Sequence, residues 1–538
     1  MRRFVCAAAV EKQMNKISPL ELKDLLHGEQ ELALIDVRGQ GAFSESHLLY
    51  AICVPLSHLD LLIGDLVPGK DTILVVVDEE TSEDFAGRAN TLLGDLGYTN
   101  VMVLDGGVAA WQVAGMELFS GVNVPSKAFG EFVEAQYETP RLPAAEVRAM
   151  LDDGRNMVIV DSRPFDEYNR MSIPTATDMP GAELAFRIHD IAPDPETFVV
   201  VNCAGRTRSI IGAQSLINAG IPNPVAALKD GTMGWHLAGL ELDHGSTRQA
   251  TVPSAEGMQK GLDAAARVAE RFGVQTVPRE TVEQWRQDKT CTTFLLDVRS
   301  PDEYANGHLP GYRSAPGGQL VQATDEYVAV KNARLVLADD VGVRSTMTAS
   351  WLIQMGWQNV YVLEDGIGEG PFESGKWVPT PLSEMGAATV TPEALAGSLD
   401  TVCVIDLGPS TSYEQQHIPG ARWCVRARLA DALADIVSPA SIVLTSPDGM
   451  LARLTLQEAR VLTTCDVQAL EGGTDRWLAE DRDTRSGLEH TVGGTDDVWY
   501  KPYEHRGAQE KFMRDYLTWE VALVEQIERD GTTRFQTF

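Results

Sequence analysis

Apolar runs followed by a polar or charged residue recur at four places along the chain. They lie at residues 34–38, 159–163, 295–299 and, in a weaker form, 404–408. Short runs of Leu, Ile and Val of this kind predict buried β-strands. A proline precedes each run at a position typical of the first turn of a helix. These prolines are Pro19, Pro143, Pro278 and Pro392. The pattern therefore predicts a helix followed by a strand, four times over.

Each predicted strand is followed by a second apolar run, a helical pattern, a short strand and a glycine turn. The turns contain Gly106, Gly231, Gly366 and Gly472, and tryptophans follow three of them at Trp111, Trp235 and Trp477. Alternating strands and helices predict α/β units, each with a mostly parallel sheet and helices on both faces.

Four such units are expected, at residues 16–122, 138–245, 276–378 and 388–486. Between the second and third units, residues 246–275 carry a small-residue helical pattern that predicts a linking helix. The tail, residues 487–538, combines aromatic residues with a second helical pattern. We expect this tail to dock either onto another part of the same chain or onto a second subunit in a homodimer.

One segment carries the residues of a reactive site. Residues 199–202 form an apolar strand that leads into Cys203, and a helical pattern begins near Ser209. The intervening loop holds Arg206 and Arg208. Backbone N–H groups at a helix start, the helix dipole and two guanidinium groups all favour an anion. The pattern predicts a reactive thiolate with a pKa below the usual value of about 8.5, and the alternative is a buried cysteine at a strand end.

The other three units lack this cysteine. Alignment on the following helix predicts Asp339 at the cysteine position of the third unit, Glu79 or Glu80 in the first, and Ser446 or Pro447 in the fourth. Only the second unit therefore keeps the nucleophile.

The order of these motifs resembles that of the rhodanese family of sulfurtransferases. The series is D-x-R, E-Y with G-H-x-P-G, a strand leading to a cysteine loop, and G-G-x-x-x-W, and residues 297–311 match its opening part almost in full. The resemblance covers roughly residues 16–485 and implies four tandem rhodanese-like domains, with only the second active. That second unit departs from the pattern at residues 171–175, where the usual His and Gly are missing.

The resemblance implies a double-displacement sulfurtransferase. Cys203 would take sulfane sulfur from a thiosulfate-like or persulfide donor and pass it to cyanide or a thiol, including the thiol of a sulfur-carrier protein. Arg206 and Arg208 would hold the anionic donor. Backbone N–H groups along the loop would stabilise the charged sulfur, those of Ala204, Gly205, Thr207 and Ser209 included. No metal and no organic cofactor is implied. In this family the equivalents of Asp161 and Arg163 are structural, and we expect them to tie the strand end to Glu167.

Two other functions stay open. A cysteine-based phosphatase or arsenate reductase of similar fold would have five residues between Cys and Arg, whereas four separate Cys203 from Arg208. The three units without a cysteine also suit a scaffold or sulfur sensor that uses them for binding.

Composition narrows the partners and the compartment. The 538 residues carry a net charge of −32, which opposes binding to nucleic acid and to anionic membranes. No apolar run approaches the roughly 20 residues that span a bilayer. The seven cysteines are scattered and include no C-x-x-C pair, so they predict neither disulfides nor a zinc site and favour a reducing cytoplasm.

Overall fold

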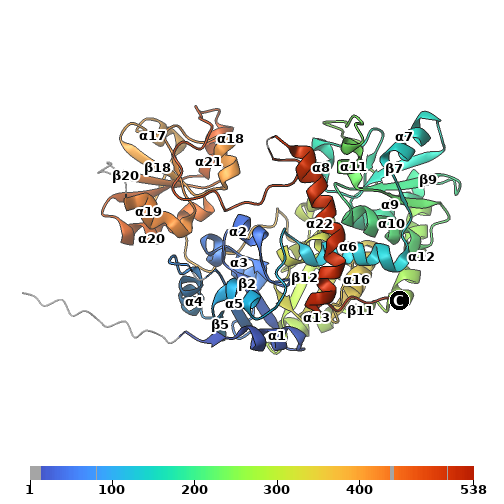
Figure 1. Ribbon diagram of the computed structural model, residues 1–538, viewed down its shortest axis with the longest axis horizontal. Coiled ribbons are helices and arrows are strands. Elements are labelled where there is room, and N and C mark those ends of the chain that lie inside the picture. Colours follow the sequence, from blue (N-terminus) through green and yellow to red (C-terminus); the bar gives the residue numbers. More distant parts are fainter. Residues whose placement is uncertain (1–13, 80, 435, 437–440, 506) are drawn as a thin grey trace, which may run out of the picture.

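The computed structural model describes residues 14–538 except 80, 435, 437–440 and 506. Four mostly parallel sheets follow one another along the chain, flanked by helices (Figure 1), and this confirms the predicted α/β class. In the first unit the order is β1-β5-β4-β2 with β3 beside β2, and the other three sheets repeat it as β6-β10-β9-β7-β8, β11-β16-β15-β12-β13 and β17-β21-β20-β18-β19.

The strands are short, and equivalent strands differ by at most one residue in length among the four units. In the first and second units they are β1 (Lys16–Ile17), β2 (Leu32–Asp36), β3 (Ile52–Cys53), β4 (Ile73–Val77), β5 (Val101–Leu104), β6 (Arg141–Leu142), β7 (Met157–Asp161), β8 (Thr177–Asp178), β9 (Phe198–Asn202) and β10 (Val225–Leu228). In the third and fourth they are β11 (Gln275–Val277), β12 (Thr293–Asp297), β13 (Arg313–Ser314), β15 (Arg334–Ala338), β16 (Val360–Leu363), β17 (Thr389–Val390), β18 (Val402–Asp406), β19 (Arg422–Trp423), β20 (Ser441–Thr445) and β21 (Asp466–Leu470).

Helices cover both faces of these sheets. Those of the first two units are α1 (Pro19–His27), α2 (Gln40–Glu45), η1 (Leu56–His58), α3 (Leu59–Leu66), α4 (Phe85–Asp95), α5 (Gly107–Val113), α7 (Ala144–Asp152), α8 (Phe165–Arg170), η2 (Gly181–Glu183), α9 (Leu184–Ile191), α10 (Thr207–Ala219) and α11 (Gly231–Leu237). Those of the last two are α13 (Arg279–Gln287), α14 (Pro301–Asn306), α15 (Gly317–Gln322), η3 (Thr324–Glu326), α16 (Val343–Gln354), α17 (Pro392–Ala396), α18 (Ser410–Gln415), η4 (Arg426–Arg428), α19 (Leu429–Ala434), α20 (Met450–Leu462) and α21 (Gly473–Ala479).

Local sequence accounts for where these elements begin and which side chains they bury. Pro19 and Pro392 are the first residues of α1 and α17, whereas Pro143 and Pro278 stand one residue before α7 and α13. All five residues of β2 are buried, and successive side chains enter clusters on opposite faces of the sheet. A strand buried on both faces needs a continuous apolar run, which is the pattern seen in the sequence.

Strand register identifies the residue that replaces the cysteine in each unit. The central strands β4, β9, β15 and β20 end at Val77, Asn202, Ala338 and Thr445, and each of these residues pairs with the last residue of the neighbouring strand β2, β7, β12 or β18. The next residue in each is Asp78, Cys203, Asp339 and Ser446, and its carbonyl accepts an N–H from the glycine-turn segment at 2.8–3.0 Å. The predictions of Asp339 and Ser446 agree with this register. The first unit carries Asp78 there; Glu79 instead binds Arg38 at 2.8 Å, and Glu80 lies outside the described residues.

The units pack in two pairs. The second and third meet through η2 and α15, with the linking helix α12 (Ala255–Phe272) against α9 and α16. The first and fourth meet through η1 and η4, where Arg426 binds Asp60 at 2.7 Å. A short strand of the third unit, β14 (Val330–Lys331), pairs antiparallel with β2 and so joins the two pairs.

Two helices outside the four sheets complete the molecule. Helix α6 (Val124–Tyr137) connects the first unit to the second, and α22 (Gln509–Asp530), in the tail, crosses it and packs against it (Figure 1). Leu523 and Ile527 of α22 are buried against Val124 and Ala128 of α6. The tail therefore docks onto its own chain.

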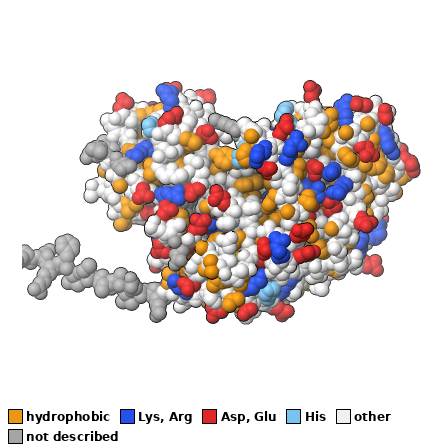
Figure 2. All heavy atoms as spheres, viewed as in Figure 1, with side chains coloured by type: hydrophobic (Ala, Val, Ile, Leu, Met, Phe, Trp, Pro, Cys, Tyr) orange, Lys and Arg blue, Asp and Glu red, His pale blue; other side chains and the backbone are white. Residues whose placement is uncertain are grey.

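None of the described helices is long and apolar enough to cross a membrane. On the face shown in Figure 2, acidic and basic side chains are interspersed.

Candidate functional site

Cys203 lies at the carboxyl end of β9, where the chain turns sharply into α10. Its side chain is buried, and it borders a cavity of about 270 Å³. The loop residues Ala204, Gly205, Arg206, Thr207 and Arg208 line the same cavity, so the structure brings most of the predicted site together. Ser209 lies behind them, fully buried, and donates a hydrogen bond from Oγ to the Arg206 carbonyl at 2.8 Å.

The cavity is built by widely separated parts of the chain. Besides the loop, its walls come from two other elements of the second unit (Glu167 of α8 and Met233 of α11), from α6 (Asn123 beside it, and Lys127), from the third unit (Gln319, Gln322, Ala323 and Glu326) and from the tail (Trp499, Lys501, Pro502, Tyr503, Tyr516 and Glu520). A unit without a cysteine thus contributes directly to the surroundings of Cys203.

Arg208 faces the cavity but is already paired. Its guanidinium donates to Glu167 at 2.8 Å and to the Gln319 side chain at 3.2 Å. Burial raises the pKa of Glu167, but the charge and hydrogen bonds of Arg208 outweigh it and lower that pKa to about 2. Sequence reasoning assigned Glu167 to Arg163 instead; Arg163 donates to Asp161 at 2.7 and 2.8 Å and to the Met171 carbonyl at 2.7 Å.

Arg206 differs from the prediction more strongly. All three guanidinium nitrogens bind carboxylates: Nε and Nη2 donate to Glu131 at 2.6 and 2.7 Å, Nη2 to Glu134 at 2.7 Å, and Nη1 to Asp230 at 3.0 Å. Two of these carboxylates come from α6, a helix that the sequence analysis did not predict. The guanidinium therefore anchors the loop to α6 and α11.

The predicted low pKa of Cys203 is wrong in this structure. Burial raises the pKa of the thiol; Arg208 and Ser209 lower it, and the charge of Glu520 raises it again. The sequence shows the two arginines but not the carboxylates that neutralise them, so it overstated the local positive charge.

Sequence reasoning also missed a buried pair at the far wall. The Lys127 ammonium lies 5.2 Å from the ring centres of Trp499 and Trp519 and 5.3 Å from that of Tyr516, and near Glu520. Burial lowers the pKa of Lys127 and raises that of Glu520, and their mutual attraction opposes both shifts. The aromatic residues of the tail predicted that it docks onto a protein surface, but the sequence did not indicate which surface they contact.

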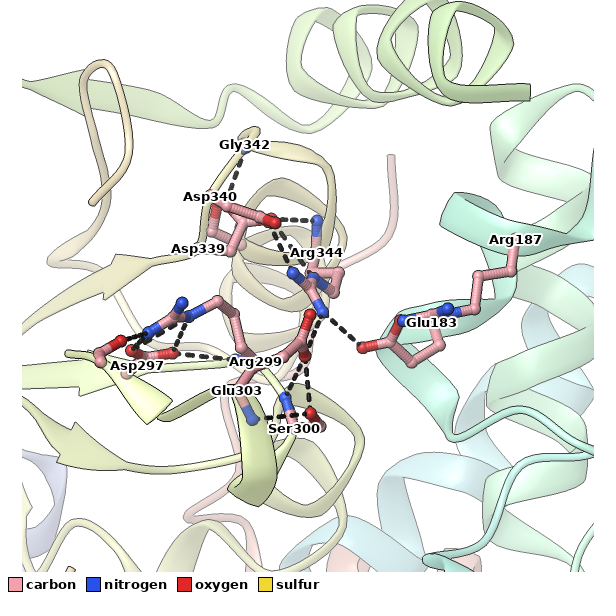
Figure 3. Close-up of polar contacts among 12 residues, drawn as sticks. Glu183, Arg187, Asp297, Arg299, Ser300, Glu303, Asp339, Asp340, Gly342 and Arg344 are labelled. Carbon is pink, nitrogen blue, oxygen red and sulfur yellow. Dashed lines mark hydrogen bonds and ion pairs between the residues drawn. The ribbon is translucent and has the colours of Figure 1, made fainter. Parts of the chain in front are cut away.

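The third unit shows the same loop with a carboxylate in place of the thiol (Figure 3). Asp339 accepts hydrogen bonds from the N–H groups of Gly342 and Arg344 at 2.7 and 2.9 Å and from the Ser345 hydroxyl at 2.9 Å. Arg344 binds Glu303 at 2.8 Å and reaches Glu183 of the second unit at 2.9 Å.

Comparison with known proteins identifies the fold family. The family model described as "Rhodanese-like domain" matches residues 18–114, 143–238 and 279–369. The chain belongs to the rhodanese family. The fourth unit lies outside these matches, but its strand order is that of the other three.

Several relatives carry informative names. A crystal structure titled thiosulfate sulfurtransferase from Pseudomonas aeruginosa is 47% identical, covers 98% of this rhodanese chain and 100% of its own, and superposes with a TM-score of 0.93. Thiosulfate sulfurtransferase GlpE of Pseudomonas paraeruginosa is 32% identical over 17% of this chain and 81% of its own length. An HTH-type transcriptional regulator of Mycobacterium tuberculosis is 34% identical over 17% of this chain, which spans only 39% of that regulator.

Proposed function

We propose that this rhodanese chain is a sulfurtransferase in which Cys203 carries sulfane sulfur. The observation that supports this most directly is the contrast among four equivalent strand ends, of which only the second presents a thiol. That thiol borders a cavity large enough for a small substrate, and a full-length neighbour bears the name thiosulfate sulfurtransferase.

The cavity holds cationic groups that an anionic donor would contact, beside the carboxyl groups of Glu167, Glu326 and Glu520. Lys127, Arg208 and Lys501 line it, and Lys501 lies 3.6 Å from Glu167. We assign donor binding to Arg208 together with these two lysines. Arg206 holds the loop in place through its carboxylate partners.

Sulfur transfer then follows in two displacements. The Cys203 sulfur attacks the outer sulfur of thiosulfate, a new S–S bond forms, and the donor S–S bond breaks so that sulfite leaves with the bonding electrons. An acceptor thiolate or cyanide attacks the outer sulfur of the persulfide and releases the Cys203 thiolate. Backbone N–H groups of residues 204–209 and the start of α10 stabilise the charged sulfur in both steps.

Mass spectrometry tests this assignment. Incubation of the protein with thiosulfate should add one sulfur atom to the peptide that contains Cys203, and Cys203→Ser should abolish both this addition and the release of thiocyanate from cyanide. Cys291→Ser, a half-buried cysteine outside the cavity, is the matched control and should behave as wild type. Sulfur uptake that persists in Cys203→Ser, or hydrolysis of p-nitrophenyl phosphate at a comparable rate, would contradict the proposal.

A further inference from the structure

The tail helix α22 places a carboxyl group beside the cysteine loop. Glu520 is 2% exposed and lines the cavity that Cys203 borders. Its Oε1 accepts a hydrogen bond from the Thr207 hydroxyl at 3.4 Å, whereas Oε2 is buried and has no hydrogen-bond partner among the described residues. Oε2 lies only 3.2 Å from the point where a Cβ on Gly205 would stand. One acceptor oxygen therefore faces the loop.

Glu520 differs from the other carboxyl groups that line this cavity. Glu167 is held ionised by Arg208, with its pKa lowered to about 2, so it is a poor proton acceptor. Glu326 accepts a hydrogen bond from the Asn123 amide at 3.3 Å. In Glu520 the carboxyl group interacts with the Tyr516 hydroxyl, Oε2 has no hydrogen-bond partner of good geometry among the described residues, and burial, against the attraction of Lys127, raises the pKa to about 7. The charged and titratable groups around it are Lys127 and Glu131 from α6, Cys203, Arg206 and Arg208 from the loop and helix start, and Tyr516 from α22.

The thiol needs such an acceptor. Burial raises the pKa of Cys203, so at neutral pH most of the protein holds a thiol there, and a thiol attacks sulfur poorly compared with a thiolate. Arg206 and Arg208 are both paired with carboxylates and supply little net positive charge to ionise it. A nearby group must therefore take the proton.

We propose that Glu520 accepts the proton of the Cys203 thiol as the cysteine takes up sulfur, and returns it when the persulfide is emptied. This inference rests on the proposed sulfur transfer. In the first step the S–H bond breaks, the proton goes to Glu520 Oε2, and the freed electron pair of Cys203 forms the bond to the outer sulfur of the donor while sulfite leaves. In the last step cyanide takes the outer sulfur as thiocyanate, and the Cys203 thiolate recovers the proton from Glu520.

Single-turnover release of sulfite from thiosulfate, followed from pH 5.5 to 9, tests the role of Glu520 in the full-length protein. The wild-type rate should rise with an inflection near the Glu520 pKa of about 7. Glu520→Gln should lose that inflection and slow the reaction at neutral pH by about 10²-fold, the lower range for loss of a general base. Glu520→Asp, which keeps a carboxyl group, should recover part of the rate. Glu528→Gln, an exposed position on the same helix, is the matched control.

A purely electrostatic role predicts the opposite sign. The Glu520 charge raises the pKa of Cys203, so removing it would lower that pKa and make Glu520→Gln faster than wild type at neutral pH. That result, or an unchanged rate, overturns the proposal.

The pH dependence of the rate at which iodoacetamide alkylates Cys203 is a second test. It needs no sulfur donor and uses the wild-type protein. Proton transfer to Glu520 predicts a lower inflection near pH 7 in the wild-type profile, and a single alkaline inflection overturns it. If the wild type takes up no sulfur from thiosulfate, the proposed function fails while this measurement still decides whether Glu520 accepts the proton.

Discussion

The cysteine loop of the second unit and the aspartate loop of the third are two versions of one structure with opposite electrostatics. Each follows a central strand at the same register and leads into a helix that carries an arginine and a serine at equivalent positions, Arg208 with Ser209 and Arg344 with Ser345. In the third unit the loop N–H groups already bind the Asp339 carboxylate. In the second unit they surround a neutral thiol.

The two loops also differ in how deeply they are buried and in how fully their arginines are paired. Asp339 and Arg344 are both fully buried, and Arg344 binds carboxylates of its own unit and of the second. Cys203 borders a cavity, and Arg208 has one carboxylate partner and a neutral amide from the third unit. The comparison teaches that this anion cradle is a packing element once a built-in carboxylate fills it; under the proposed function it is a reaction site where that carboxylate is missing.

Removing the two equivalent arginines should separate these roles. Arg208→Met should reduce sulfur transfer by about 10²–10³-fold, the range seen when one donor to a developing anion is lost. Arg344→Met should leave sulfur transfer near wild type but destabilise the fold by about 3–5 kcal/mol, because it removes the guanidinium that faces the fully buried Asp339 at 3.7 Å and bridges to Glu183, which keeps only its ion pair with Arg187. Steady-state kinetics and urea unfolding measure the two effects. Equal losses of activity in both variants would show that the loops do not differ in function.

The loss of folding stability at acid pH should also differ between the two loops, by less than the effects of the arginine substitutions. The folded-state pKa of Glu167 is lowered from 4.5 to about 2, since Arg208 outweighs the effect of burial, and Arg344 together with the hydrogen bonds from Ser300 does the same for Glu303. A carboxyl group with a lowered pKa contributes stability above pH 4.5 that is lost as the pH falls toward about 2.

Glu167→Gln and Glu303→Gln should each therefore flatten the decline of urea midpoint between pH 5 and 3. The effect should be smaller for Glu303, because its side chain is 34% exposed against 19% for Glu167, and solvent screens the pair. A decline as steep as wild type in both variants would assign the acid loss to other groups.

The sequence was sufficient to predict the repeated fold, because strands buried on both faces require apolar runs that can be read directly. It also located Cys203 and the replacement at Asp339. It could not predict that α6 neutralises Arg206, that Gln319 contacts Arg208, or that Glu520 enters the cavity. These contacts join residues more than 70 positions apart and come from packing between units, on which hydrophobic periodicity carries no information. The prediction of Glu79 or Glu80 at the cysteine position of the first unit was wrong for a different reason. The loop could be aligned in more than one way, and only the strand register shows that Asp78 occupies this position.

The smallest effect is expected from restoring the thiol alone. Asp339→Cys in a Cys203→Ser background should take up no sulfur from thiosulfate, as judged by the mass of the peptide that spans the substituted position. The thiol would occupy a fully buried site whose arginine is bound by Glu303 and Glu183. The loop backbone also differs: Gly342 has φ +82°, a left-handed conformation, where the second unit has Arg206 at φ −119°.

The loop of the third unit therefore differs from that of the second in its backbone and its surroundings as well as in the residue at the cysteine position. Sulfur uptake at the introduced cysteine would overturn this view and reduce the difference between the two units to a single side chain. Asp339→Ser in the same background supplies the control, because serine is close to cysteine in size but cannot carry sulfur. The expected result, no uptake in either variant, would place the function of the second unit in its cavity and backbone as well as in Cys203.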